Sequence, residues 1–151
     1  MTRGVLKIAT TSQASKQLVV SGAILFLLGL LQGAAVPYFL NPRMALSAHL
    51  TAVQSGTAIM VAGAVWGWTH LPAGWDMIGS RAVIAGMYGL WLALTLSAAT
   101  GASESLPIAG DGYGAGEFLE ALVSAAVAGS SVIMVAGWTV LTVGLLRKKV
   151  P

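Results

Sequence analysis

The chain has 151 residues, of which 56% are hydrophobic and 9% charged, and its mean hydropathy is +0.82. A soluble domain of this size carries about a quarter charged residues, so these few charges exclude a water-facing surface and indicate a membrane protein. The net charge of +3 comes from basic residues at the termini and helix ends, which favours membrane orientation over nucleic-acid binding, and the lack of cysteine excludes disulfides and thiolate ligands.

Four apolar stretches follow in chain order, and each is long enough to cross about 30 Å of hydrocarbon as a helix of about 20 residues. The first ends at Asn41-Pro42, which is a stop-and-turn signal, and a polar, glycine-rich loop separates the third from the fourth. The sequence therefore predicts one all-α membrane domain over residues 1–151, a bundle of four transmembrane helices. The expected spans are residues 18–40, 44–71, 82–99 and 118–146.

Basic residues predict the orientation. They flank both ends of the chain, and an even number of spans places both ends on one side, which the positive-inside rule makes the cytoplasm. The loop at 101–116 carries Glu104 and Asp111 without a base, which suits the opposite side. We expect a multi-pass protein of the bacterial inner membrane with both termini cytoplasmic. The flanking basic residues are Arg3, Lys7, Lys16, Arg147, Lys148 and Lys149.

Glycines at helical spacing predict close packing of the spans. Gly29 and Gly33 form a GxxxG pair in the first span, and Gly63 and Gly67 form one in the second. Such spacing lets backbones approach closely in lipid, although glycine is also common in membrane helices generally. Four spans enclose little interior, so we expect a pocket to need more than one subunit.

His49 is the most informative residue, because it lies about one and a half turns into the second span. A polar ring in hydrocarbon costs several kcal/mol unless it is hydrogen-bonded, paired or ligated. Three interpretations are open: a structural imidazole bonded to a helix carbonyl, a proton relay, or a metal or haem ligand. No second titratable group lies at i+3 or i+4 for a relay, and no second His or Cys is near for zinc, whereas a haem needs only one axial ligand. His70 is twenty-one residues further along one helix, about 30 Å, so the two histidines cannot share an iron.

Three further side chains are candidates for chemistry. The Tyr88 hydroxyl can donate to a substrate oxygen or to a backbone carbonyl. Ser55 lies six residues past His49, about 120° around the helix, so the two would line one cavity only across a subunit interface. Glu120 is either a general base or, as we favour, an interfacial carboxylate. The polar residues of the spans offer no machinery for hydrolysis or phosphoryl transfer.

Three segments resemble the hydroxylaminobenzene mutase family of small four-span membrane proteins, which are distantly related to styrene oxide isomerases. They are the run Asn41 to Leu50, the pair Tyr88-Gly89 and the stretch Leu106-Pro107-Ile108-Ala109-Gly110. The most specific piece is Asn-Pro-Arg-Met-x-Leu-x-Ala-His-Leu, although Ser55 stands where the family commonly has an asparagine. In the isomerase branch the histidine of this run holds a haem b in an oligomer, usually a trimer, where the ferric iron acts as a Lewis acid on the epoxide oxygen.

This resemblance makes haem b the favoured partner of His49, with Arg43 beside a haem propionate and Ser55 or Tyr88 orienting the substrate. We therefore predict a haem-dependent membrane isomerase that converts a small lipophilic arylhydroxylamine to an aminophenol. By analogy with the family we expect a homo-oligomer, with a trimer as the favoured form. One alternative is an aryl epoxide isomerase that yields an aldehyde. Another is a non-catalytic membrane cytochrome or structural protein. Membrane lipid is the other expected partner.

Overall fold

The computed structural model describes residues 12–147, so Arg3, Lys7, Lys148 and Lys149 of the orientation argument lie outside the described residues. All the regular elements of the described part are helices, including 3-10 turns at Val36–Tyr38 and Trp66–Trp68. The helices are α1 (Gln13–Ala35), α2 (Pro42–Val65), α3 (Ala73–Thr100), the short α4 (Pro107–Gly110) and α5 (Glu117–Leu146).

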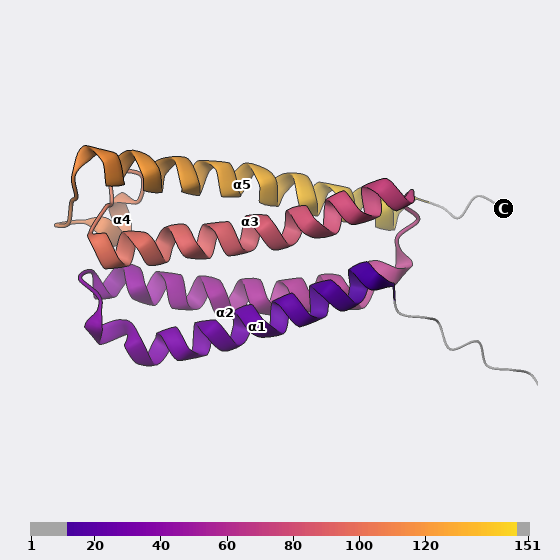
Figure 1. Ribbon diagram of the computed structural model, residues 1–151, viewed down its shortest axis with the longest axis horizontal. Coiled ribbons are helices and arrows are strands. Elements are labelled where there is room, and N and C mark those ends of the chain that lie inside the picture. The colour runs from indigo at the N-terminus through magenta and orange to yellow at the C-terminus, as the bar shows by residue number, and fades with distance from the viewer. Residues whose placement is uncertain (1–11, 148–151) are drawn as a thin grey trace, which may run out of the picture.

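The long helices form two antiparallel pairs. Helix α1 packs along α2, helix α3 packs along α5, and contacts between α2 and α3 join the two pairs (Figure 1). Helix α4 lies at one end of the bundle, near the start of α5. The start of α1 and the end of α5 lie together at the opposite end, as an even number of spans requires. That this terminal end faces the cytoplasm stays a prediction.

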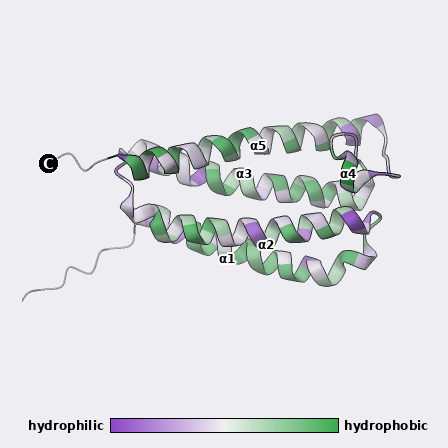
Figure 2. Cartoon of the chain, turned by 180° about the vertical axis from the view of Figure 1, so that it is seen from behind, coloured by the Kyte–Doolittle hydropathy of each residue, from purple (hydrophilic) through white to green (hydrophobic). Residues whose placement is uncertain are grey.

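Within residues 12–147 four helices are long and apolar enough to cross a membrane, which confirms the expected all-α fold with four spans. Figure 2 shows that hydrophobic residues dominate the helices, while hydrophilic residues gather mainly in the loops and at the helix ends. Two clusters fill the interior. One runs along the bundle around Leu18, Leu25, Ile59, Trp66 and Val83, and the other lies near α4 around Met44, Leu94 and Ala98.

Helix α3 begins at Ala73, nine residues before the expected start of the third span at residue 82. The apolar stretch stops short there because Asp76 and Arg81 interrupt it. Charged residues such as Asp76 and Arg81 are compatible with a helix that starts in the polar interface. Helix α3 is therefore longer than the apolar stretch within it. At its far end α3 stops at Gly101, whose φ of +81° is a left-handed conformation that favours glycine.

Glycines bring α1 and α2 into backbone contact, as the spacing of Gly29 and Gly63 predicts. A Cβ added to Gly56 would lie 2.5 Å from the Phe26 nitrogen, and one added to Gly63 would lie 2.9 Å from the Ser15 carbonyl oxygen. Close packing of this kind contributes to helix association in lipid. Gly67 does not take part, because nothing lies within 4 Å of a Cβ placed there, so only the first half of the second GxxxG pair is at the interface.

Candidate active site

The His49 ring lies at the edge of the contact between α1 and α2. Its Nδ1 is 2.7 Å from the carbonyl oxygen of Gly29, and the side chain is half-buried. Because a carbonyl can only accept, Nδ1 is the donor in this contact, and in the neutral ring Nε2 then keeps its lone pair. This hydrogen bond satisfies the polar ring, as the interpretation of His49 as a structural imidazole requires. It is equally compatible with His49 as a metal or haem ligand, since metal-binding histidines usually donate their other N–H to such an oxygen.

Gly33 makes room for the ring. A Cβ at this position would lie 2.8 Å from Cε1 and 2.9 Å from Nδ1 of His49, so any side chain would push the imidazole away. The second glycine of the first GxxxG pair therefore accommodates a side chain rather than a backbone. The neighbouring Leu46 and Leu50 are exposed, so the site opens sideways from the bundle, toward lipid or another copy of the chain.

The His49 contact suits a residue that would hold a haem. His49 would bind the iron through Nε2 of the neutral ring, whose orientation is fixed by the bond to the Gly29 carbonyl oxygen. Among residues 12–147 no three His, Cys, Asp or Glu side chains gather as a metal-binding group. A haem needs no such group, because its porphyrin supplies the other ligands.

Arg43 lies six residues before His49, about 9 Å along the axis of α2. It is exposed, and Nη2 donates to the carbonyl oxygen of Asp111 at 2.5 Å. One contact leaves other N–H groups of the guanidinium available, so the predicted contact with a propionate stays a prediction. The observed contact assigns Arg43 at least one role, which is to hold the loop after α4.

The structure does not bring Tyr88 and Ser55 together with His49 within one chain. The Tyr88 hydroxyl donates to the Ser21 carbonyl oxygen at 2.8 Å, and Ser21 lies eight residues before Gly29 on α1, about 12 Å along the helix. Ser55 is only 6% exposed and lies on the buried stripe of α2. Their expected roles in orienting a substrate stay predictions.

A partly buried polar network around Gln32 was not expected from the sequence. The Trp91 indole N–H donates to Gln32 Oε1 at 2.7 Å, and Gln32 Nε2 donates to Thr95 Oγ1 at 3.0 Å. Gln32 lies between Gly29 and Gly33, the two glycines that contact the His49 ring. By tying α1 to α3 at this point, the network fixes how α1 presents both glycines to the imidazole.

Replacing Gln32 with leucine is expected to disturb the proton position on His49. The change removes two interhelical hydrogen bonds, worth about 0.6 kcal/mol each in membrane helices, and leaves the buried Trp91 N–H unpaired. With α1 less firmly held, the Nδ1–H form loses population to the Nε2–H form. Nitrogen-15 spectra of histidine-labelled, haem-free protein measure the two forms, and His70→Gln in the background leaves a single histidine.

Ser15→Ala is the matched control for this experiment. It removes a buried hydrogen bond between α1 and α2, from Ser15 Oγ to the Gly63 carbonyl oxygen, far from the imidazole. We expect lower stability with an unchanged proton position on His49. Equal populations of the two forms in both variants would show that Gln32 does not position the ring.

Hydrogen bonds with Asn41 and Glu120 hold the loop between α3 and α5. Asn41 is fully buried, accepts from the Met44 amide and donates to the Ala109 carbonyl oxygen, so it caps α2 and holds α4. Glu120 accepts the backbone N–H groups of Ser103, Glu104 and Ala115 at 2.8–2.9 Å. Glu120 was interpreted as either a general base or an interfacial carboxylate, and these contacts support the interfacial carboxylate.

Glu120→Ala is expected to loosen this loop without melting the bundle. Three amide hydrogens lose their acceptor, so hydrogen exchange at Ser103, Glu104 and Ala115 should accelerate. Glu120→Gln keeps an acceptor oxygen but loses the charge, and its exchange rates should fall between those of the wild type and the alanine variant. Exchange mass spectrometry resolves these amides, and unchanged protection in Glu120→Ala would contradict the pinning.

Fold and site together define a four-span helical membrane protein with one imidazole held between two closely packed helices. Residues 14–146 match the family model described as styrene oxide isomerase. Hydroxylaminobenzene mutase HabA of Ectopseudomonas oleovorans is 35% identical over 131 residues, which cover 86% of this chain and 97% of that relative. Hydroxylaminobenzene mutase HabB of the same organism is 33% identical over 127 residues, which cover 83% and 77%.

The chain belongs to the styrene oxide isomerase family. It is an enzyme of the isomerase class, as the names of the family and of both relatives indicate. The predicted resemblance is confirmed over most of the chain.

Proposed function

We propose that this protein is a haem-dependent membrane isomerase that rearranges a small arylhydroxylamine to an aminophenol. The similarity to HabA supports the reaction, because it extends over 97% of that mutase. The observation that carries the proposal is the hydrogen bond from His49 Nδ1 to the Gly29 carbonyl oxygen. It leaves Nε2 of the neutral ring as a fixed candidate ligand within a membrane span.

The reaction needs no external oxidant or reductant. The N–O bond of the hydroxylamine breaks, a C–O bond forms on the ring, one ring proton is lost and the nitrogen gains one. A ferric haem held by His49 would supply a Lewis acid that polarises the substrate oxygen. His49 would hold the group through Nε2, Gly29 would fix the ring through Nδ1, and Gly33 would give the ring room to lie against α1.

The surroundings of His49 suit a lipophilic substrate. Exposed leucines flank the ring, so an aryl ring can arrive from the hydrocarbon, and the same side chains keep water from intercepting a reactive intermediate. We propose a homo-oligomer, with a trimer as the expected form, in which a neighbouring copy covers the side of His49 where Leu46 and Leu50 are exposed. We place it in the bacterial inner membrane with both termini cytoplasmic.

An aryl epoxide rearranged to an aldehyde is the second candidate, and the description of the matching family favours it. Both reactions open a weak bond to an oxygen that is polarised first, so one site can serve either substrate. The two reactions diverge after that bond opens, because the hydroxylamine returns its oxygen to the ring whereas the epoxide shifts a hydrogen between carbons.

Purified protein assayed side by side with phenylhydroxylamine and styrene oxide tests the proposal. We expect a Soret band from bound haem and a larger kcat/KM for phenylhydroxylamine. Turnover of styrene oxide without turnover of phenylhydroxylamine would identify the aryl epoxide as the substrate instead. Protein expressed with ample haem that lacks a Soret band would exclude haem dependence, and a low-spin bis-imidazole spectrum without turnover would favour an electron carrier.

A further inference from the structure

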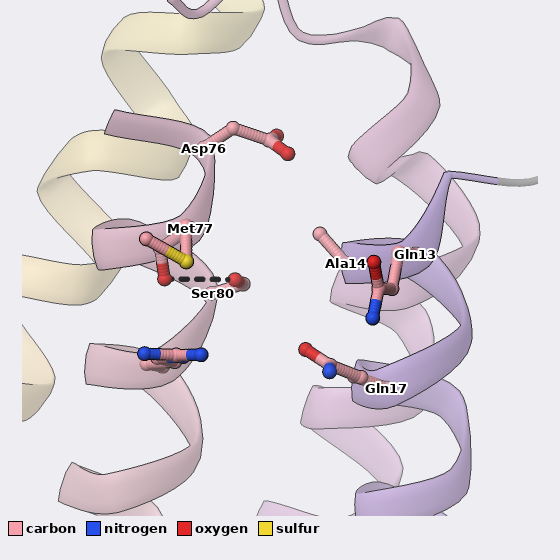
Figure 3. A pocket seen from close by; sticks show the side chains of 7 residues that line it. Gln13, Ala14, Gln17, Asp76, Met77 and Ser80 are labelled. Carbon is pink, nitrogen blue, oxygen red and sulfur yellow. Dashed lines mark hydrogen bonds between the residues drawn. The ribbon is translucent and has the colours of Figure 1, made fainter. Parts of the chain in front are cut away.

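A polar cavity lies at the terminal end of the bundle, between the first turns of α1 and α3. It has a volume of about 140 Å³, well above the roughly 10–15 Å³ that one water needs. Figure 3 shows the side chains of α1 and α3 facing each other across it. The lining residues are Gln13, Ala14, Gln17, Asp76, Met77, Ser80 and Arg81.

The depth of this cavity matches that of lipid headgroups. The spanning segments begin at Gln13 and Gly74, so the cavity occupies the first turns of two transmembrane helices, where hydrocarbon gives way to the polar interface. Val20 and Ile24 continue the α1 stripe of Gln13 and Gln17 at helical spacing, and both are exposed. A polar cavity that continues into an exposed apolar stripe has the shape of a site for a phospholipid.

The cavity carries one negative and one positive side chain. Asp76 and Arg81 are five residues apart on α3, which is not the three- or four-residue spacing at which side chains pair on a helix. Arg81 is about 7.5 Å further along the axis from the terminal end, and therefore deeper in the membrane. Asp76 Oδ1 already accepts the Trp66 indole N–H at 2.5 Å, which fixes the carboxylate on the cavity wall.

We infer that this cavity binds the headgroup of a zwitterionic aminophospholipid. Its phosphate, which lies nearer the acyl chains, meets Arg81 and the amide of Gln17, and its primary ammonium, which lies further out, meets the free oxygen of Asp76. The order of the two charges along α3 matches their order in the lipid. An anionic phosphatidylglycerol has no cation for Asp76, and the quaternary ammonium of phosphatidylcholine has no N–H to donate to it.

Native mass spectrometry of the delipidated full chain, titrated with dioleoyl lipids, tests the inference. We expect phosphatidylethanolamine to bind at least about tenfold more tightly than phosphatidylcholine or phosphatidylglycerol. Arg81→Gln should lose that affinity by about the same factor. Asp76→Asn keeps an acceptor for the Trp66 N–H, so it should fold normally and bind phosphatidylethanolamine and phosphatidylcholine equally.

Arg147→Gln is the matched control, because Arg147 lines a separate cavity with Leu71 and Trp75. It should leave the preference for phosphatidylethanolamine intact. Equal binding of the three lipids by the wild type would overturn the inference, as would equal losses in Arg81→Gln and Arg147→Gln. Displacement of the lipid by equimolar glycerophosphoethanolamine would also overturn it, since the site would then take a soluble ester. Thermal melts by circular dichroism verify that each variant is folded.

Discussion

Replacing His49 with alanine is expected to abolish haem retention and isomerase activity while the four-helix fold survives. The fold survives because the change removes one hydrogen bond, to Gly29, worth about 0.6 kcal/mol in membrane helices, against a total stability of about 5–15 kcal/mol. Activity should fall by at least about a hundredfold, since loss of an outer-shell partner alone costs about 10- to 100-fold. Haem absorbance per chain, turnover and a thermal melt measure the three quantities.

His70→Ala is the control for this prediction. His70 is exposed beyond the other end of α2, and its backbone N–H, which the substitution keeps, donates to the Gly144 carbonyl oxygen. This variant should retain haem and full turnover. If His49→Ala also kept its Soret band and activity, the assignment of His49 as the ligand would be refuted.

Gly56→Ala is expected to lower the free energy of unfolding by about 1–3 kcal/mol, the range for adding a methyl group to a tightly packed interior. The new Cβ would lie 2.5 Å from the nitrogen of Phe26 and 2.8 Å from the carbonyl oxygen of Gly22. Both are backbone atoms that no side-chain rotation can move, so α1 and α2 must separate. Unfolding in mixed micelles with increasing denaturing detergent measures the change.

The same substitution at Gly129 is the matched control. Gly129 lies inside α5, and nothing lies within 4 Å of a Cβ placed there. Gly129→Ala should therefore leave stability unchanged or raise it by up to about 1 kcal/mol through helix propensity. Similar unfolding midpoints for Gly56→Ala and Gly129→Ala would contradict the close approach of α1 and α2.

The number and type of the long helices follow directly from the sequence, because hydrocarbon demands long apolar runs with internal hydrogen bonds. Their ends are less predictable, since polar residues at an interface neither require nor prevent a helix. For this reason α3 extends outward through Arg81 and Asp76, and the short α4 appears in a loop expected to be irregular. Asn41-Pro42, interpreted from the sequence as a stop-and-turn signal, also starts α2, because asparagine is a favoured N-cap and proline a favoured first helical residue.

The site was predictable only in part. His49 stands out because an imidazole in hydrocarbon needs a partner, but the partner is a backbone carbonyl of Gly29, and every residue has one. Gln32 carries the only side-chain amide of the first apolar run, which is a usable signal. Its partners, Trp91 and Thr95, lie more than fifty residues away in sequence and become visible only when the helices are packed.

The imidazole, the carbonyl that holds it and the glycine beneath it all belong to the hairpin formed by α1 and α2. Chains emerge from the ribosome with the N-terminal part first. The His49 site within this hairpin can therefore form once α1 and α2 have been inserted, before α3 and α5 pack against them. Packing of α3 then stabilises the site through the hydrogen bonds of Gln32. Formation of the His49 site and assembly of the four-helix bundle are therefore separable steps of folding.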